Sequence, residues 1–294
     1  MALTWKNLFL LIVLTCNTIF GQKESINLPF FSLNVKDGLS QNYITCTTQD
    51  FEGFIWIGTR NGLYKYDGYH FEQINLKEKG IQDNHINCLY RGSDQNLWIG
   101  TNKGPVLYDY QSGDLTPLFL ENGALAKSIT TFFQQDKKNI WIGTGEGQLL
   151  SYNIANNEIK KYSHPGFRNI SSIGITNTNT ILIGFKYGGL LTFSIKNEKF
   201  SVPKGYEQIG GTGINSIIEA KPETFLVVTP KGVFLYKHGV NPLEVQKLIS
   251  PTNANALNSV ISLLAVNNKH IWLGTDGHGI LEYTIASGKL EPLR

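Results

Sequence analysis

The chain has 294 residues, of which 41% are hydrophobic and 17% charged, and its formal net charge is +3. This composition excludes a disordered chain and predicts a globular protein large enough to bury a core. The small net charge, with no basic stripe, argues against a nucleic-acid partner. Residues 1–21 predict a signal peptide, because Lys6 precedes a short apolar core at residues 8–14. The mature chain, residues 22–294, is therefore expected in the periplasm or outside the cell.

Residues 30–35 come next and are expected to form a lone outer strand that helps to close a ring of repeats. Closing a ring with strands from both chain ends removes unpaired edges. The last repeat has its own outer strand near residues 289–293, so two arrangements stay open. Either six blades close with a spare strand, or a seventh blade is incomplete. We favour a seven-bladed ring whose other three strands lie beyond Arg294.

A short apolar motif, most often Trp-x-Gly-Thr, then recurs along the chain. The marker residues are Trp56, Trp98, Trp141, Leu182, Leu226 and Trp272. Their spacing of 41 to 46 residues is typical of a propeller blade, and no helical periodicity accompanies it. The sequence therefore predicts an all-β fold, a β-propeller of four-stranded antiparallel blades with six repeats visible. The expected blades lie near residues 40–80, 81–122, 123–165, 166–206, 207–250 and 251–294.

Each repeat is expected to contain four strands in a fixed order. A β-branched run forms the first strand, where Ile44 and Cys46 are expected on one face because their offset is even. The marker strand is second, and its tryptophan should pack between blades. A turn that ends in glycine, such as Gly62, leads to a third strand that reaches an aromatic residue such as Tyr66. A more polar fourth strand follows.

The three cysteines need separate interpretations. Cys16 would permit a lipid anchor, but residues 13–15 make a poor lipobox, and cleavage after Gly21 is favoured. Cys46 and Cys88 would enter an oxidising compartment, where pairing must be considered. They hold equivalent positions that other repeats fill with Thr or Ser, and a disulfide would need Cα atoms within about 7 Å. Unpaired thiols are favoured, and a disulfide stays open.

Two motifs occur together at the first repeat: Asp-Gly-Leu-Ser-Gln at residues 37–41, and Trp-x-Gly-Thr-x-x-Gly-Leu at residues 56–63. The pair resembles the two-component regulator propeller repeat, which builds periplasmic sensor regions of hybrid two-component system histidine kinases in Bacteroidetes. The resemblance covers about residues 28–294 and implies carbohydrate sensing in signal transduction. Family members usually continue into an immunoglobulin-like domain, a transmembrane helix and a histidine kinase. It implies that C-terminal signalling domains or a partner chain are missing, that the chain alone is not an enzyme, and that it is membrane-tethered only within a longer chain.

The loops entering each blade and the turns between second and third strands should share one face, where propellers commonly bind ligands. That face gathers aromatic, charged and amide side chains, which together suit a sugar. The predicted ligand-binding residues are Tyr43, Arg60, His85, Asn102, Lys103, Glu146, Lys186, Tyr187, Asp276 and His278. No cofactor fingerprint or zinc-ligand spacing occurs, so neither a cofactor nor a metal site is predicted.

The favoured hypothesis is a non-catalytic, ligand-sensing propeller that detects an oligosaccharide or another small periplasmic ligand. A homodimer through propeller faces is an open expectation. One alternative is a secreted scaffold for protein–protein interaction, which a flat upper face would support. The other is a lyase or glycosidase acting on polysaccharide, which would need a Tyr-His or paired-carboxylate cluster over the channel.

Overall fold

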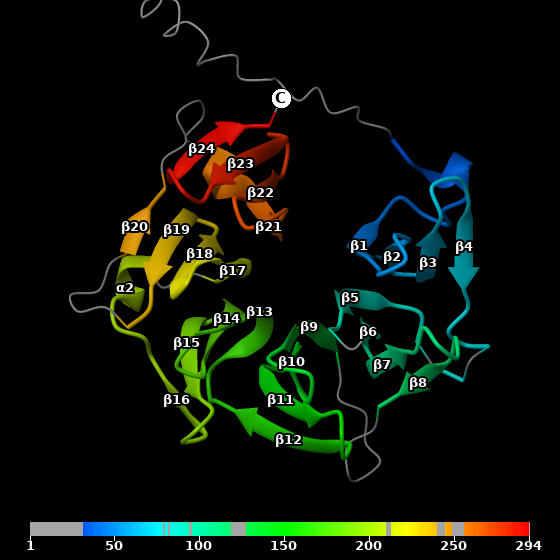
Figure 1. Cartoon of the computed structure of the whole chain (residues 1–294), viewed down its shortest axis with the longest axis horizontal. Helices are drawn as coiled ribbons and strands as arrows, with labels where there is room; N and C mark the ends of the chain where they lie inside the picture. Colours follow the sequence, from blue (N-terminus) through cyan, green and yellow to red (C-terminus); the bar gives the residue numbers. More distant parts are fainter. Residues whose placement is uncertain are drawn as a thin grey trace, which may run out of the picture. The chain divides into compact units, whose positions relative to one another are not determined.

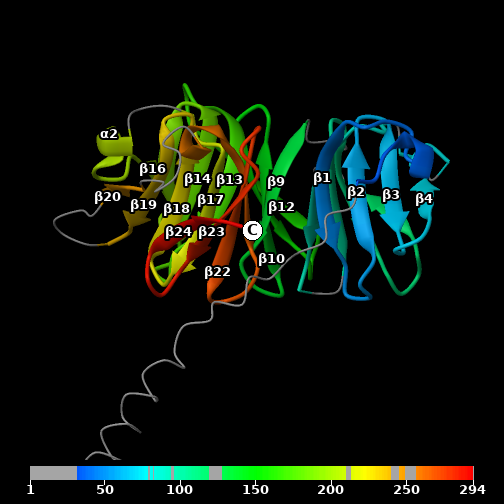
Figure 2. The ribbon, with the colours of Figure 1, turned by 90° about the horizontal axis from the view of Figure 1, so that it is seen from above.

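Each repeat of the sequence folds into one antiparallel sheet of four strands. The computed structural model describes residues 32–293, apart from residues 79, 82, 94–95, 119–127, 210–212, 240–244 and 249–255. Within Leu33–Leu293, six four-stranded sheets follow one another around a central axis (Figures 1 and 2). The prediction of an all-β propeller with six visible repeats is confirmed. The expected signal peptide lies outside the described residues.

The strands of every sheet pair in chain order, so each sheet is an antiparallel meander. The strands are β1 Ile44–Gln49, β2 Ile55–Thr59, β3 Gly62–Tyr66 and β4 Phe71–Ile74 in blade 1; β5 Ile86–Arg91, β6 Leu97–Thr101, β7 Gly104–Tyr108 and β8 Leu115–Pro117 in blade 2; β9 Ile129–Gln134, β10 Asn139–Thr144, β11 Gln148–Asn153 and β12 Glu158–Ser163 in blade 3; β13 Arg168–Ile175, β14 Thr180–Tyr187, β15 Gly189–Ser194 and β16 Lys199–Ser201 in blade 4; β17 Ser216–Lys221, β18 Thr224–Thr229, β19 Gly232–Lys237 and β20 Val245–Lys247 in blade 5; and β21 Val260–Ala265, β22 His270–Thr275, β23 Ile280–Thr284 and β24 Lys289–Pro292 in blade 6. In the described chain, helical structure is limited to η1 Val35–Asp37, α2 Tyr206–Ile209 and η2 Ala256–Ser259.

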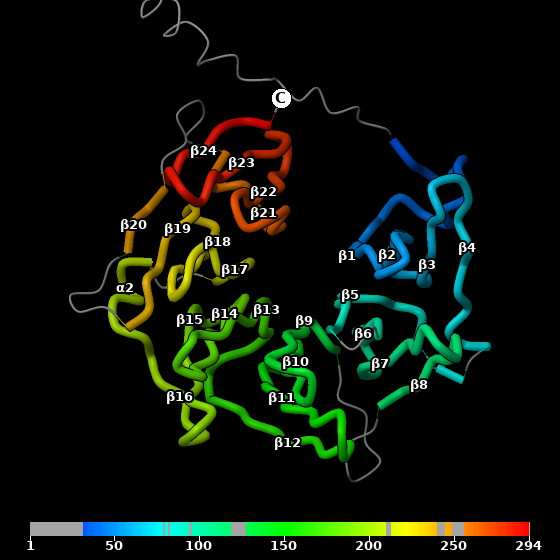
Figure 3. Tube along the Cα trace, viewed as in Figure 1, coloured from blue at the N-terminus to red at the C-terminus, as the bar shows by residue number. Residues whose placement is uncertain are grey.

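The first strand of each blade lies nearest the axis, and the fourth lies at the outside (Figure 3). Each first strand from β1 to β17 contacts the first strand of the following blade. We call the side of a blade that faces the next blade in the chain its forward face, and the other side its back face. The core is divided accordingly, because each of five apolar clusters joins two neighbouring blades.

The marker tryptophans of blades 1 to 3 pack between blades, as predicted. Each lies on the forward face, against the aromatic residue of the third strand in the next blade. The ring centroids are 4.9 Å apart for Trp56–Tyr108, 5.6 Å for Trp98–Tyr152 and 5.8 Å for Trp141–Phe193. These rings bury large apolar areas and so hold the blades together.

The predicted facing of the first strand is wrong, because a β-bulge lies between its two key residues. Ile44 pairs with Thr59 and Cys46 pairs with Gly58, so the register shifts by one residue. Cys46 faces forward, whereas Ile86, the counterpart of Ile44, faces back. A Cβ built on Gly58 would lie 2.5 Å from Cys46 Sγ and 2.7 Å from Ile86 Cγ2. Glycine therefore permits close approach of the blades here. Cys46 and Cys88 are both free, as favoured.

The outer strand expected at residues 30–35 is not formed by the part that the structure describes. Residues 30–31 lie outside the described residues. Asn34 caps the short helix η1 instead: its side chain accepts from Lys36 N at 2.9 Å, and its own N–H donates to Asp37 Oδ2 at 2.7 Å. This capping turn competes with strand pairing for the same backbone groups. The segment then places Leu39 over Tyr64 on the back face of blade 1.

Candidate functional site

In every blade except blade 4, a threonine ends the marker strand and shapes the turn between the second and third strands. In blade 1, Thr59 Oγ1 donates to Gly62 O at 2.9 Å and accepts from Asn61 N at 3.0 Å. Thr101 and Thr229 make the same pair of bonds in blades 2 and 5. Gly62 has a φ of 137°, which a side chain would disfavour. The motif thus builds the same tight turn at one end of blades 1, 2 and 5, and a turn one residue longer in blades 3 and 6.

These turns and the loops that precede each first strand define what we call the loop face. All ten predicted ligand-binding residues lie at this end of the blades, because they precede a first strand or flank a second-to-third-strand turn. Two aromatic side chains are largely exposed there, Tyr43 at 55% and Tyr187 at 65%. Arg60, Lys103, Glu146 and Lys186 are exposed as well. Whether the set binds a ligand stays a prediction.

Blade 1 contributes a preassembled pair to the loop face. The Arg60 guanidinium carbon lies 4.1 Å from the centroid of the Tyr43 ring. This stacking holds both side chains in place while the arginine keeps donors for an incoming acceptor.

Blade 2 forms a hydrogen-bonded polar cluster around Asp83. Its carboxylate accepts from His85 N at 3.1 Å and from Asn102 N at 2.9 Å. The Asn102 side-chain oxygen accepts from Asn87 Nδ2 at 3.0 Å. Two of the predicted residues, His85 and Asn102, are therefore tied to one carboxylate that the sequence reasoning did not single out.

Blade 6 brings a serine, a histidine and an aspartate together, but their bonds do not form a nucleophile triad. Ser259 Oγ lies 3.1 Å from His278 Nδ1 and itself donates to Ala256 O at 2.9 Å. His278 Nδ1 also lies 3.1 Å from Asp276 O, a backbone carbonyl that can only accept. Nδ1 therefore carries the hydrogen, so this nitrogen cannot take a proton from the serine. In this arrangement the histidine acts as a donor that braces the turn.

Contacts among the predicted residues stay within single blades. Tyr43 meets Arg60, His85 and Asn102 share Asp83, and Asp276 meets His278. Among the described residues, no group of three or more His, Cys, Asp or Glu side chains is placed to hold a metal ion. The predicted residues thus form separate small clusters of rings and polar groups on the loop face.

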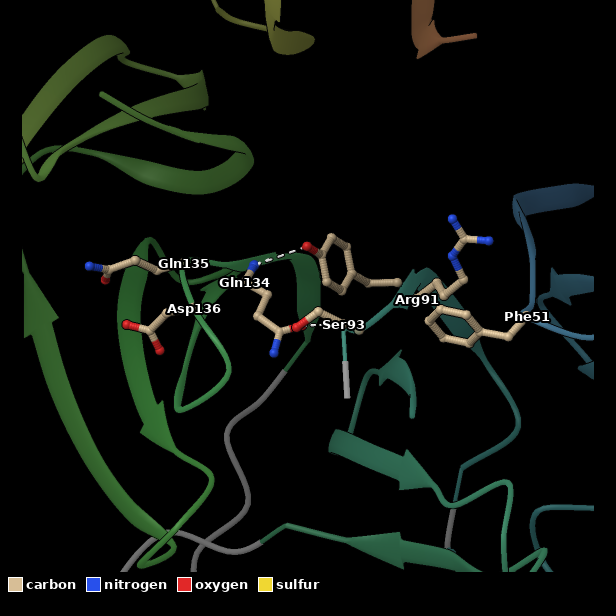
Figure 4. A pocket seen from close by; sticks show the side chains of 8 residues that line it. Phe51, Arg91, Ser93, Gln134, Gln135 and Asp136 are labelled. Atoms are coloured by element: carbon tan, nitrogen blue, oxygen red, sulfur yellow. Dashed lines mark hydrogen bonds between the residues drawn. The ribbon is translucent and has the colours of Figure 1, made fainter. Parts of the chain in front are cut away.

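A cavity of about 330 Å³ lies at the other end of blades 1 to 3. It is lined by Phe51, Tyr90, Arg91, Gly92, Ser93, Gln134, Gln135 and Asp136. These residues end the first strands or lie in the turns to the second strands. In Figure 4, Gln134 lies between the Arg91–Phe51 pair on one side and Asp136 with Gln135 on the other.

Long polar side chains of this cavity reach from one blade to the next. The Arg91 guanidinium lies 4.8 Å from the Phe51 ring centroid and its Nη1 is 3.5 Å from Asp50 O. Gln134 Oε1 accepts from Ser93 N at 2.6 Å, and Gln134 N donates to Tyr90 Oη at 3.1 Å. The sequence reasoning missed this cavity, because these positions vary between repeats and carry no motif.

Asp136 closes the third side and is already engaged by its own turn. Its Oδ1 accepts from Lys138 N at 2.7 Å and Asn139 N at 2.8 Å, and its Oδ2 from Asn139 Nδ2 at 3.1 Å. Burial raises the pKa of this carboxyl, but the hydrogen bonds together outweigh burial and hold the pKa below its ordinary value. Asp136 is therefore ionised at neutral pH with few acceptor positions left.

Two stretches of the chain match a known repeat family. The two-component regulator propeller family matches residues 38–61 and 80–103, as the sequence resemblance predicted. A 64-residue stretch is 38% identical to histidine kinase P4 of Formosa agariphila, covering 22% of this chain and 5% of that protein. None of the described helices is long and apolar enough to cross a bilayer.

Two solved structures show how widely this architecture is used. The extracellular domain assigned to a hybrid two component system of B. thetaiotaomicron superposes with a TM-score of 0.71 at 21% identity, over 90% of this chain and 36% of that domain. Virginiamycin B lyase of Staphylococcus aureus has a TM-score of 0.66 at 14% identity, over 86% and 85% of the two chains. This chain thus spans about a third of the extracellular domain, and similar propellers include an enzyme.

Proposed function

We propose that this propeller is a non-catalytic, ligand-sensing module of the periplasm, and that its loop face binds a glycan-derived ligand. Signalling domains on a longer chain, or on a partner chain, would read its occupancy. The observation that carries the proposal is the pairing of exposed aromatic rings with cationic and amide groups on one face, above all Tyr43 with Arg60. Rings stack on sugars and the polar groups bind hydroxyls. The two-component repeats and the similarity to an extracellular two-component domain support the same function.

The enzyme alternative is less well supported on this face. Ser259 and His278 make the bonds of a braced turn, as described above, so they do not form a nucleophile and base. The similarity to a lyase at 14% identity concerns the fold alone. The homodimer through propeller faces stays a prediction.

The test is thermal unfolding and calorimetry of the whole chain against a panel of oligosaccharides. A ligand at one hundred times its Kd should stabilise the fold by about 2.7 kcal/mol. Tyr187→Ala and Arg60→Gln should abolish the shift. Tyr69→Ala is the matched control, because Tyr69 is 85% exposed but lies in the β3–β4 turn at the other end of blade 1. Product formation from any glycan would overturn the non-catalytic assignment, and equal shifts in all variants would overturn the site.

We further propose that a seventh blade, carried by the same longer polypeptide, completes the ring between blades 6 and 1. The support comes from two surfaces that we call the free faces. The forward face of blade 6 exposes Ile261 at 61%, Leu264 at 58% and Val266 at 41%. The back face of blade 1 exposes Ile44 at 38%, whereas its counterparts in the other five blades are at most 1% exposed.

The free faces are complementary halves of the interface that every other pair of blades forms. A forward face offers the marker residue, which is Trp in blades 1, 2, 3 and 6 and Leu in blades 4 and 5. In four of the five interfaces, an isoleucine on the back face of the next blade meets the glycine two residues after the marker. Trp272 keeps exposed surface and Gly274 meets only Ser262 of its own blade, while Ile44 meets no such glycine. A partner that satisfies both faces needs one back face and one forward face, which is the description of one more blade.

This second proposal is tested by extending the chain by one repeat length of its natural continuation. Iodide or acrylamide quenching of Trp272, measured with the other four tryptophans replaced by Phe, should fall on extension, and urea unfolding should shift to higher denaturant. Unchanged quenching would overturn the proposal. Protection that appears only after a second polypeptide is added would overturn the assignment to the same chain.

A further inference from the structure

Blade 4 departs from the pattern that shapes the other turns of the loop face. The other five marker strands end in threonine, whereas blade 4 carries Phe185 at that position. Its first two strands continue toward the loop face instead, so that Arg168 and Tyr187 pair directly across β13 and β14. Departures from a protein's own local pattern are expected at functional sites.

The extended hairpin of blade 4 is held by packing below it and by a hydrogen bond beside it. Phe185 is fully buried, and its ring centroid lies 5.0 Å from that of Phe167. Gly188 closes the hairpin with a φ of 131°, and its carbonyl accepts from Tyr206 Oη of helix α2 at 2.9 Å. Tyr187, at the tip, is 65% exposed. The hairpin therefore presents an ordered ring to the loop face, which lowers the ordering cost of binding.

Blades 1 and 4 each combine an arginine with a tyrosine on this face. The Arg60 guanidinium stacks on the Tyr43 ring at 4.1 Å. Arg168 and Tyr187 are directly opposite on antiparallel strands, which places both side chains on one face with Cβ atoms about 4.5–5.5 Å apart. All four residues are exposed, and neither guanidinium makes a hydrogen bond or an ion pair with another residue that the structure describes. The two blades stand across the axis from each other (Figure 1).

The loop-face ends of the second strands, with the turns after them, carry opposite charges in different blades. Cations stand there in blades 1, 2, 4 and 5 and acids in blades 3 and 6, namely Arg60, Lys103, Lys186 and Lys231, and Glu146 and Asp276. Lys186 adds a second positive charge to the blade 4 hairpin. Glu146 accepts from Gln148 Nε2 at 3.4 Å and is not ion-paired with Arg168. The positive charge is therefore concentrated on two sides of the ring, which suits a ligand with separate anionic groups.

An arginine beside an aromatic ring matches two features of an acidic sugar residue. The planar guanidinium binds oxyanions such as carboxylates through parallel hydrogen bonds. The tyrosine ring covers the apolar side of a sugar ring. A neutral sugar would leave the positive charge without a partner, and a bare anion would leave the tyrosine without one.

We propose that the loop face selects an acidic oligosaccharide, one that carries at least two carboxylate or sulfate groups. The Tyr43–Arg60 pair takes one acidic residue of the ligand, and the Arg168–Tyr187 pair takes another. The ligand thus spans the mouth of the channel. This inference rests on the glycan-binding function proposed above, and it adds the charge of the ligand and its two points of attachment.

The experiment is calorimetric titration of the whole chain with two matched pairs of tetrasaccharides. Tetragalacturonate is compared with its methyl ester, and a sulfated carrageenan tetrasaccharide with its desulfated form. At least one acidic member should bind at least tenfold more tightly than its neutral form, a difference of about 1.4 kcal/mol. Added NaCl should weaken that binding, because the cations are exposed and salt screens them.

The outcomes separate this inference from the function on which it rests. Neutral members that bind as tightly as the acidic ones, with binding lost in Tyr187→Ala, would overturn the acidic selectivity and keep the loop face as a glycan site. Absence of binding by all four tetrasaccharides and by the neutral panel would overturn both.

The variants test the two points of attachment. Arg168→Gln and Arg60→Gln should each lower the affinity for the acidic member at least tenfold, which is about 1.4 kcal/mol, and should affect the neutral form much less. Lys269→Gln is the matched control, because it removes an exposed cation from the β21–β22 turn at the other end of the blades. Glu146→Gln should raise the acidic affinity, since it removes an opposing charge from the loop face. Unchanged affinity in a folded Arg168→Gln protein, or an equal loss in Lys269→Gln, would overturn the proposal.

Discussion

The interface between blades 2 and 3 and the free forward face of blade 6 carry the same motif in different surroundings. Trp98 is fully buried and lies against Phe132 and Tyr152 of the next blade. Trp272 holds the same position, keeps exposed surface, and donates its indole N–H to Glu282 of its own blade at 3.1 Å. The motif therefore supplies only one half of an interface. How much its side chains stabilise the fold depends on whether a neighbouring blade covers them.

The largest expected contrast comes from truncating the two tryptophans. Trp98→Ala should lower the free energy of unfolding by about 3–5 kcal/mol, because it removes a buried ring from a close-packed interface. Trp272→Ala should lower it by about 1 kcal/mol, because part of that ring is already in water. Urea unfolding of both variants measures the contrast. Equal losses would show that Trp272 is as well packed as Trp98 and would remove the basis of the comparison.

A second contrast concerns Cys46, which lies over Gly58 in the marker strand of blade 1. Burial raises the pKa of the Cys46 thiol from 9.0 to about 11, against smaller lowering effects of hydrogen bonds with Thr45 and Gly58. Because the folded pKa is the higher one, the protonated thiol stabilises the fold fully below pH 9, and this contribution is lost as the pH rises through 11. The loss is at most about 2.7 kcal/mol for two units of pKa.

Cys46→Ser supplies the reference for that measurement, since blade 6 carries Ser262 at the same repeat position. The difference in unfolding free energy between the native chain and Cys46→Ser should shrink from pH 9 to pH 11. A difference that stays constant across this range would mean that the thiol is not shielded by the contact between blades 1 and 2.

Sequence periodicity predicted the architecture well, because strand length, turn glycines and the apolar marker residue are local properties that recur in every repeat. The facing of Ile44 and Cys46 was wrong, because a β-bulge adds a residue that no spacing rule reveals. The loop-face residues could be assigned to one end of the blades, but their contacts depend on groups such as Asp83 that no motif marks. The cavity could not be predicted at all, because it depends on how far Arg91 and Gln134 reach across blade boundaries.

The same comparison, between a covered interface and the free forward face of blade 6, can be made at the glycine two residues after the marker. A Cβ on Gly143 would lie 2.6 Å from Ile170 Cγ2 of the next blade and 2.7 Å from Thr131 Cγ2. Gly143→Ala should therefore cost about 1–3 kcal/mol by overpacking. In Gly274→Ala the new methyl group meets only Ser262 of its own blade, and the hydroxyl of that serine can rotate away. This variant should stay within about 0.5 kcal/mol of the native chain. Chemical unfolding that ranks Gly274→Ala as the more damaging change would contradict the assignment of the free face.

The smallest effect is expected at the free face itself, where a charge should be tolerated. Leu264 is 58% exposed, and Ile218, at the same repeat position in blade 5, packs against the core shared by blades 5 and 6. Leu264→Asp should change the unfolding free energy by less than about 0.5 kcal/mol, whereas Ile218→Asp should cost several kcal/mol, because it places a charge in an apolar contact. Sedimentation should also show weaker self-association for Leu264→Asp, because an exposed apolar face favours association and a charge opposes it. In a longer chain whose seventh blade covers Leu264, the same substitution should become as damaging as Ile218→Asp. If it is as damaging in the present chain already, the forward face of blade 6 is covered by another part of this molecule.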